Sequence, residues 1–311
     1  MYHPYFRGKT YELVTIRENA ILLAKSGFVP IIEPVREGLN SLQRALSAVC
    51  HAKGNAIVII NPYHGEHAEN GAEISKFLKA NFFNGAIKAG ILLKKSMSVN
   101  EALALCYHHK EHNPSLIHAG FVDPKTLASQ LSDEFNISKH IFFDQYCGKL
   151  YRKHFNGIPR ILLKDGFKRR RNADHPAIEE FSELHVTYKQ EDMDGFGDFL
   201  IVGDEYSEGG GPAYAVAIHL TFIDPDKDEV MYIHHFISEK KDTPTDPGGK
   251  FSEALKKLIL NLASPNSKLL EDNAIKEFRK LHEDGHFPGL GYVKKLSMQH
   301  HIETLADFLS K

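Results

Sequence analysis

The residues best suited to chemistry are four carboxylates that each follow an apolar run. Glu33 ends the run FVPIIE, Asp144 ends SKHIFFD, and Asp204 and Glu205 come directly after FLIVG. Carboxylates that converge can bind a divalent ion, or can act as an acid and base pair in which one pKa is raised. We therefore predict these four as catalytic residues. Their spacing does not show convergence, and the alternative is that each is solvated or paired with a nearby lysine.

A dense basic segment lies beside the apolar run that ends at residue 164. Arginine forks form paired hydrogen bonds with phosphate oxygens, and lysine adds a compact positive charge. A solvated surface run and a contact to an acidic partner are the alternatives. We predict that the following residues bind an anion: Lys164, Lys168, Arg169, Arg170, Arg171 and Asn172.

The chain has 19 histidines, which raises the question of a metal site. His108 and His112 stand four residues apart, but they do not form an HExxH motif, so a solvated helix end is the simpler interpretation. His219 and His234 fall within two β-type runs, where a hydrogen-bonded structural histidine is the favoured interpretation. A divalent metal stays a possible cofactor whose ligands are unknown.

Neither cysteine nor serine chemistry is indicated. Cys50, Cys106 and Cys147 are widely spaced and form no CxxC pair, so we expect reduced thiols. No GxSxG motif is present. The glycines at 209–211 precede Pro212 without the GK[ST] of a phosphate-binding loop, so a connector is favoured there.

Apolar, β-branched runs of strand length recur through the first two thirds of the chain. Each run is nearly continuous, as expected of a parallel strand that is buried on both faces. Segments with helical spacing separate the runs, and Ser98 with Glu101 predicts a capping box at the start of one helix. The expected strands cover residues 28–33, 56–61, 87–93, 115–121, 138–144, 159–164 and 199–203.

The pattern changes after residue 203. Runs at 213–223 and 230–237, separated by DPDKDE, predict an antiparallel hairpin, and residues 250–311 have helical spacing. About seven or eight strands favour an α/β fold like a TIM barrel, in which strand ends meet at one mouth. An open sheet with a helical C-terminal subdomain is the alternative, but no GxGxxG follows the first run. We predict a single domain over 1–311, with 250–311 as its helical C-terminal part.

Composition places the chain among ordinary globular proteins. Its 311 residues are 42% hydrophobic and 25% charged, with a formal net charge of −2. A charge this close to zero gives the whole molecule no attraction to nucleic acid or to a membrane surface. Because the sequence shows neither a membrane-spanning run nor a signal peptide, we expect a cytoplasmic protein with no membrane partner.

Three stretches together resemble one family. They are MYHPYFRGKTYE with FVPIIEPV behind it, DGFKRRRNADHP at 165–176, and GDEYSEGGGPAYAVAIHLTFI at 203–223. They resemble the poorly characterised beta-family proteins of bacteria and phages, especially a branch of similar length in mobile-element and defence neighbourhoods. The resemblance implies a barrel-like fold and a companion protein encoded nearby. It implies no established activity and no catalytic residues.

These observations lead to three functional hypotheses. The first is recognition of an anionic ligand, a nucleotide or nucleic acid, at the strand-end mouth, within a phage-defence or mobile-element module. The second is a non-catalytic component of such a module, whose basic segment binds a protein partner. The third is a metal-dependent hydrolase that uses Glu33, Asp144, Asp204 and a histidine. Whether the protein is an enzyme is left open.

Overall fold

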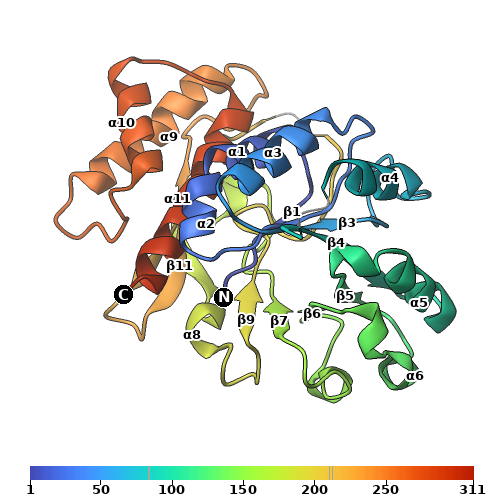
Figure 1. Ribbon diagram of the computed structural model, residues 1–311. Helices are drawn as coiled ribbons and strands as arrows, with labels where there is room; N and C mark the ends of the chain where they lie inside the picture. Colours follow the sequence, from blue (N-terminus) through green and yellow to red (C-terminus); the bar gives the residue numbers. More distant parts are fainter. Residues whose placement is uncertain (83–84, 210, 212) are drawn as a thin grey trace. The chain divides into compact units, whose positions relative to one another are not determined.

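The computed structural model describes residues 1–82, 85–209, 211 and 213–311 (Figure 1). Its internal contacts divide the chain into two compact units. Unit 1 comprises Met1–Lys164 and Thr187–Phe199, and unit 2 comprises Asp165–Val186 and Leu200–Lys311. The single-domain interpretation of residues 1–311 stays a prediction.

Unit 1 is an eight-stranded parallel sheet that curves into a barrel. Backbone hydrogen bonds from His3 to Phe196, at 2.8 Å, and from Tyr5 to Asp198, at 2.9 Å, link the last strand to the first. The α/β, TIM-barrel-like prediction is therefore confirmed. The strands, in their order around the sheet, are β1 (Tyr5–Phe6), β2 (Ile31–Ile32), β3 (Ala56–Ile59), β4 (Ile87–Lys94), β5 (Ser115–Ala119), β6 (Lys139–Phe143), β7 (Arg160–Leu163) and β9 (Gly195–Gly197).

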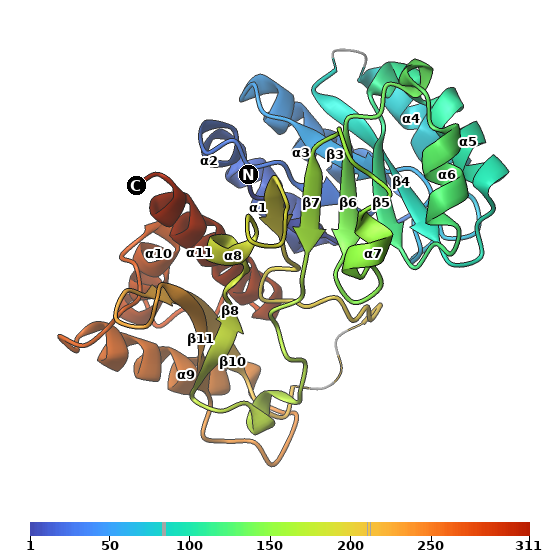
Figure 2. The same cartoon turned by 90° about the horizontal axis from the view of Figure 1, so that it is seen from below.

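Helices connect most of these strands and lie outside the barrel (Figure 2). The capping box is confirmed at the start of α5: the Ser98 side chain accepts from the Glu101 backbone N–H, and the Glu101 side chain accepts from the Ser98 backbone. The helices of this unit are α1 (Thr10–Glu18), α2 (Ala20–Lys25), α3 (Asn40–His51), α4 (Ala72–Asn81), α5 (Val99–His108), α6 (Pro124–Gln130) and α7 (Lys149–Arg152).

Alternate residues of the strands fill the barrel interior, because successive side chains of a strand point to opposite faces. The interior cluster includes Ile31 of β2, Leu92 of β4, Phe143 of β6 and Leu163 of β7. A strand-end residue that lies two positions after an interior residue points to the barrel interior as well. The residue directly after an interior residue points to the opposite side of the strand. This alternation separates the predicted site residues into two sets.

The expected strand at 199–203 is wrong. Leu200 has a φ of +51°, and residues 200–202 form a turn instead of extended chain. The last barrel strand is β9, a Gly-Phe-Gly segment without β-branched residues. A Cβ atom on Gly197 would lie 2.1 Å from the His3 carbonyl oxygen, so this close approach needs glycine.

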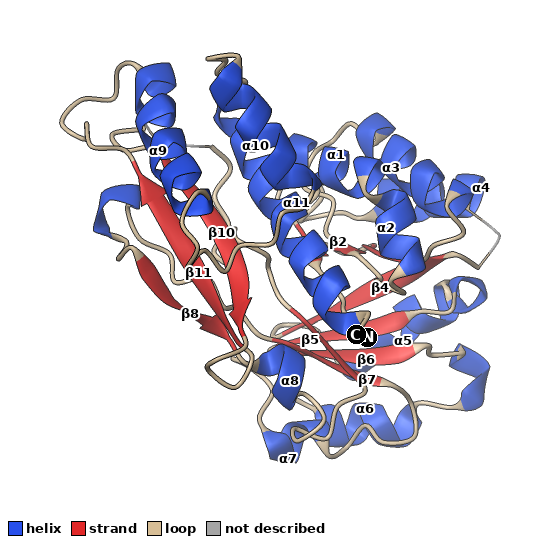
Figure 3. Ribbon diagram, turned by 90° about the vertical axis from the view of Figure 1, so that its left-hand side faces the viewer, coloured by secondary structure: helices blue, strands red, loops and turns tan. Residues whose placement is uncertain are grey.

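Unit 2 contains a three-stranded antiparallel sheet with the order β10-β11-β8 and three long helices (Figure 3). The predicted hairpin is β10 (Ala217–Asp224) with β11 (Val230–Ile237), and the predicted C-terminal helices are also confirmed. The sequence did not indicate β8 (Ile178–Ser182). The helices are α9 (Pro247–Leu262), α10 (Asn273–Glu283) and α11 (Leu290–Leu309); the short α8 (Leu184–Thr187) spans the boundary between the units.

The two faces of this sheet have different surroundings. Ile218, Leu220 and Phe236 pack into an apolar core with residues of α9, α10 and α11, including Phe251 and Phe278. His219 and His235 have the opposite parity on the same strands, so they lie on the other face. The alternation of β10 and β11 therefore separates an apolar core from a histidine-bearing surface.

A buried hydrogen-bonded pair, His300 with Asp272, joins α11 to the rest of unit 2. The His300 Nδ1 atom lies 2.6 Å from Asp272 Oδ2, and its Nε2 atom lies 2.9 Å from the Thr221 carbonyl oxygen. The other oxygen of Asp272 caps α10 by accepting from the Ile275 backbone N–H at 2.8 Å. One carboxylate thus joins the start of α10 to α11, while His300 joins α11 to β10.

Asp272→Ala should destabilise unit 2 by about 3 kcal/mol, because it removes the hydrogen-bond partner of the buried His300 Nδ1 and also a helix cap. Denaturant unfolding followed by circular dichroism measures this loss. Asp272→Asn, which keeps a capping oxygen, should lose less, and Asp284→Ala on the exposed end of α10 should change little. Equal stability of Asp272→Ala and Asp284→Ala would contradict this assignment.

Unit 1 buries an amine at the start of β6. Lys139 is 8% exposed, and its Nζ atom lies 3.0 Å from His3 Nε2. Burial, with a smaller contribution from the charge of Lys88, lowers the pKa of Lys139 from 10.5 to about 8. The folded state therefore releases this proton at a lower pH than the unfolded chain does.

Lys139 should contribute a rise in the stability of unit 1 between pH 8 and pH 10, because in this range its amine binds a proton in the unfolded state that it has released in the folded state. Lys139 alone can contribute up to about 3 kcal/mol to this rise. We expect Lys139→Met to flatten the pH dependence of the unfolding free energy, and Lys53→Met, at an exposed position, to leave it as in the parent protein. Parallel pH profiles for the parent and Lys139→Met would exclude this role.

Candidate metal centre

Glu33, at the end of β2, is fully buried and saturated with donors. Its Oε2 atom accepts from the Tyr5 hydroxyl at 2.9 Å and from the Arg7 guanidinium. Its Oε1 atom accepts from the backbone N–H groups of Tyr63, at 2.7 Å, and His64, at 3.0 Å. A carboxylate that accepts from four donors has little capacity left to bind a metal ion, which favours a structural role at the barrel end.

Lys94, at the end of β4, shares the interior-facing parity of Glu33. Its Nζ atom donates to the Pro62 carbonyl oxygen at 2.7 Å and lies 5.7 Å from the centre of the Tyr63 ring. Burial lowers the pKa of Lys94, and the charge of Glu33 opposes this shift. Glu33 and Lys94 are thus two strand-end positions of unit 1 whose parity matches the barrel interior.

Asp144 and Lys164 have the opposite parity, because Phe143 and Leu163 occupy the interior. The Asp144 side chain is 41% exposed and lies 3.7 Å from Arg152. Lys164 is exposed, and its backbone N–H donates to the Gly197 carbonyl oxygen at 3.1 Å. The carboxylates of Glu33 and Asp144 therefore start from opposite faces of the strands, which gives no support to their convergence.

The other two predicted carboxylates lie in unit 2, where they follow a turn instead of a strand. The Asp204 backbone N–H donates to Asp165 Oδ2 at 2.7 Å. Glu205 is exposed, and its carboxylate lies 3.5 Å from Arg169, which also donates to the Glu205 carbonyl oxygen at 2.7 Å. The strand-end argument that selected Asp204 and Glu205 does not apply to them.

The predicted anion-binding segment is mostly paired within unit 2. Arg170 binds both oxygens of Glu179, and Lys168 Nζ lies 3.6 Å from Glu179 Oε2. Arg171 makes a forked pair with Asp174, with contacts of 2.7 and 3.2 Å. The Asn172 amide donates to the Ala215 carbonyl oxygen at 2.9 Å. These pairs leave the segment far less cationic than its sequence implies. Gly210 and Pro212 of the nearby glycine motif lie outside the described residues.

Three histidines of unit 2 converge on one point. His219 of β10 and His235 of β11 are directly opposite each other in the register, and their Nδ1 atoms are 2.7 Å apart. His175 follows a short 3₁₀ helix, Asn172–Asp174, and stacks on His235 with ring centres 4.3 Å apart. One ligand atom from each histidine lies within 4.8 Å of the others. Nitrogen ligands of a tetrahedral zinc ion lie about 3.4 Å apart, so small side-chain rotations would complete a site.

The imidazoles of this cluster are neutral near pH 7. Burial, with a smaller contribution from His175, lowers the pKa of His235 to about 4. Burial also lowers the pKa of His175, and it lowers that of His219 well below the usual range. Phe167 contributes to this shielding, since its ring centre lies 5.2 Å from that of His219. A neutral imidazole keeps the lone pair that a metal ion requires.

Glu179 of β8 orients the cluster. Its Oε1 atom lies 3.2 Å from His235 Nε2 and 3.6 Å from His175 Nδ1. If His235 Nε2–H donates to this carboxylate, its Nδ1 lone pair faces His219. Burial alone would raise the pKa of Glu179, but hydrogen bonding to Arg170 and the charge of Arg170 outweigh it and give a pKa of about 2. Glu179 is thus a poor proton acceptor at pH 7 and a good partner for a ligating histidine.

Sequence reasoning missed this cluster, although part of its signal was present. A hairpin that closes with Asp224 opposite Val230 places His219 opposite His235. The expectation of a structural histidine at 219 did not use this register. The sequence pattern did not single out His175, because no periodicity connects an irregular loop to a hairpin far along the chain.

Comparison with known proteins gives no family. No protein-family model matches the chain, and no curated protein matches it. The resemblance to beta-family proteins therefore stays a prediction. Among the described residues, no helix is both long enough and apolar enough to cross a membrane.

Glu33→Gln should destabilise unit 1 by about 3 kcal/mol, because it removes the negative charge that faces the buried Arg7 guanidinium. Asp144→Asn is the matched control: its contact with Arg152 is longer and its side chain is partly exposed, so we expect a loss below about 1 kcal/mol. Urea unfolding of both variants tests this difference. A fully stable Glu33→Gln protein would contradict the structural role.

Proposed function

We propose that unit 2 binds a divalent transition-metal ion through His175, His219 and His235. The observation that carries this proposal is the convergence of three neutral imidazoles on one face of the small sheet. Imidazole nitrogen suits zinc and similar borderline ions better than magnesium or calcium, which prefer oxygen ligands. This is the third hypothesis of the sequence analysis with a different set of ligands.

We further propose that the centre is hydrolytic. Three protein ligands leave a coordination position for water, as in catalytic zinc sites, whereas structural sites use four. The bound ion would supply a water molecule of lowered pKa and polarise the substrate oxygen. Glu179 would hold His235 in the required orientation, and Phe167 would shield the cluster from bulk water.

The charges around the centre favour an anionic ester as the substrate. Lys168 and Arg170 both contact Glu179, so two cations share a single carboxylate. Lys294 is close enough that its charge contributes to the lowered pKa of His219. This excess of positive charge supports the earlier prediction of an anionic ligand. In this proposal the cations lie beside a metal ion and do not form a phosphate clamp of their own. A companion protein and a role in a defence module stay predictions.

The purified protein should bind one Zn²⁺ ion per chain, and His219→Ala and His235→Ala should each weaken binding at least about 100-fold. Glu179→Gln should weaken it about 10- to 100-fold, as removal of an orienting carboxylate does elsewhere. Isothermal titration calorimetry measures these affinities. His286→Ala, which changes an exposed histidine of unit 2, is the control and should bind as the parent does.

The same variants separate binding from catalysis. The zinc-loaded parent should hydrolyse a phosphate ester such as p-nitrophenyl phosphate, and His219→Ala should not. Undiminished zinc affinity in the histidine variants would refute the metal centre. Tight binding without turnover of phosphate or carboxylate esters would refute only the hydrolytic role.

A further inference from the structure

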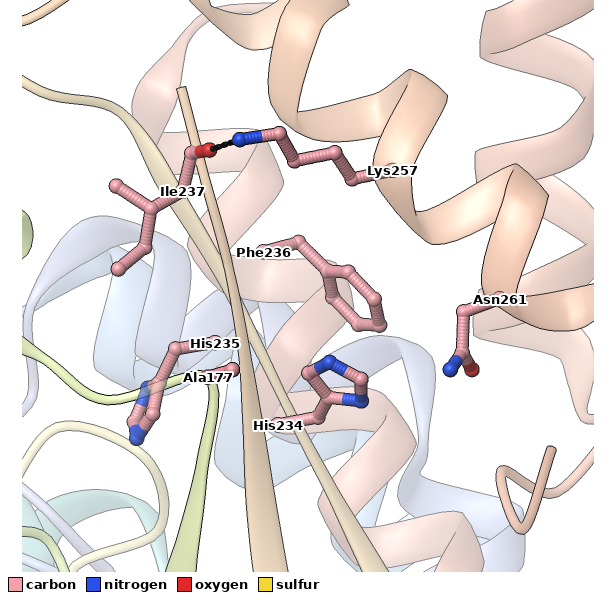
Figure 4. Close-up of a pocket in the computed structure, with 7 residues that line it drawn as sticks. All are labelled: Ala177, His234, His235, Phe236, Ile237, Lys257 and Asn261. Atoms are coloured by element: carbon pink, nitrogen blue, oxygen red, sulfur yellow. Dashed lines mark hydrogen bonds between the residues drawn. The ribbon is translucent and has the colours of Figure 1, made fainter. Parts of the chain in front are cut away.

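A cavity of unit 2 lies on the opposite face of β11 from the histidine cluster. It has a volume of about 380 Å³ and is lined by Ala177, His234, His235, Phe236, Ile237, Lys257 and Asn261 (Figure 4). We call it the β11 pocket. His234 and His235 are consecutive in the strand, so their side chains lie on opposite sides of it, as Figure 4 shows. The pocket and the metal centre therefore lie on opposite sides of β11, and His235 borders both.

The floor of the pocket is an aromatic stack. The rings of His234 and Phe236 are nearly parallel, with centres 4.0 Å apart and planes inclined by 21°. Phe236 is 3% exposed and is anchored in the apolar core, whereas His234 is half-buried at the cavity. A fixed aromatic pair favours a flat ligand that continues the stack, because ring faces attract one another in offset arrangements.

The polar groups around this stack have donors and acceptors that a ligand could bind. Within the described part of the chain, neither ring nitrogen of His234 makes a hydrogen bond, so the imidazole offers a donor and an acceptor. Asn261 of α9 accepts from Ser267 at 3.1 Å through its oxygen, and its amide hydrogens have no partner among the described residues. Lys257, one turn earlier in α9, donates to the Ile237 carbonyl oxygen at 2.8 Å and has two further N–H groups.

We propose that the β11 pocket binds the planar heteroaromatic ring of a nucleobase, as part of a nucleoside or mononucleotide. The ring would stack on His234, and its edge nitrogens and oxygens would bond to His234 and to the amide of Asn261. A purely apolar ring would leave these polar groups unpaired, which disfavours a hydrocarbon ligand. The pocket volume lies within the range of small-molecule sites, at its lower end. This inference does not depend on the metal centre.

The test is binding of a panel of nucleosides and mononucleotides to the full chain, measured by ligand-observed NMR and by calorimetry. At least one base should bind, and its nucleoside should bind within about tenfold of its nucleotide if the ring is the recognised part. His234→Leu, which fills similar space without a ring or polar atoms, and Asn261→Ala should each weaken binding at least about fivefold, the lower end for loss of one base stack.

Two control variants make the result specific. Lys256→Ala, at an exposed position of α9 outside the pocket, should not change binding, and neither should His219→Ala on the other face of the sheet. Binding lost in His219→Ala but retained in His234→Leu would place the ligand at the metal centre and overturn the proposal. So would the absence of binding by every nucleoside and nucleotide at millimolar concentration, with circular dichroism showing a folded protein.

Discussion

The antiparallel register of β10 and β11 is the constraint on which both sites of unit 2 depend. With Asp224 opposite Val230, His219 must lie opposite His235. Strand alternation then puts these two imidazoles on one face and His234 with Phe236 on the other. A slip of β11 by one residue against β10 would turn His235 toward the helical core and expose Phe236, which now packs there. The apolar core therefore fixes the position of the histidine cluster.

Burial gives the cluster its chemical character. Desolvation disfavours the charged form of an imidazole, so the three histidines stay neutral and keep their lone pairs. Glu179 remains charged in the same surroundings because Arg170 binds both of its oxygens. The environment thus holds neutral nitrogen ligands beside an ionised carboxylate, a combination typical of metal sites in which an outer carboxylate orients a ligating histidine.

The barrel of unit 1 uses its strand-end charges differently. Glu33 receives four hydrogen bonds, including those from Arg7 and Tyr5, and it connects the ends of β1 and β2 to the loop after β3. Position at the carboxyl end of a barrel strand is a good indicator of function in general. In this chain the hydrogen-bonding of Glu33 favours a connecting role instead.

Much of the fold could be predicted from sequence because it depends on local pattern. The buried strands from β3 to β7 and the hairpin are runs of β-type residues, and the last three helices have clear apolar spacing. Two barrel strands could not be found this way: β1 has two residues, and β9 is Gly-Phe-Gly. Their pairing is set by tertiary closure of the sheet, which leaves no periodic signal.

The candidate site shows the same division between local and tertiary information. The pairing of His219 with His235 follows from the hairpin register, so it could have been predicted from the sequence. The position of His175 could not, because an irregular loop brings it to the cluster. The ion pairs of the basic segment were also beyond the sequence, because the carboxylates that pair with its cations include Glu179, whose position depends on the unpredicted strand β8.

The most direct test of the central claim is anomalous diffraction from crystals grown with Zn²⁺, with data recorded on both sides of the zinc absorption edge. The account predicts one strong peak within bonding distance of nitrogen atoms of His175, His219 and His235, with Glu179 bound to the outer nitrogen of His235. A map with no peak at these three histidines, or with the zinc ion held by other residues, would contradict it.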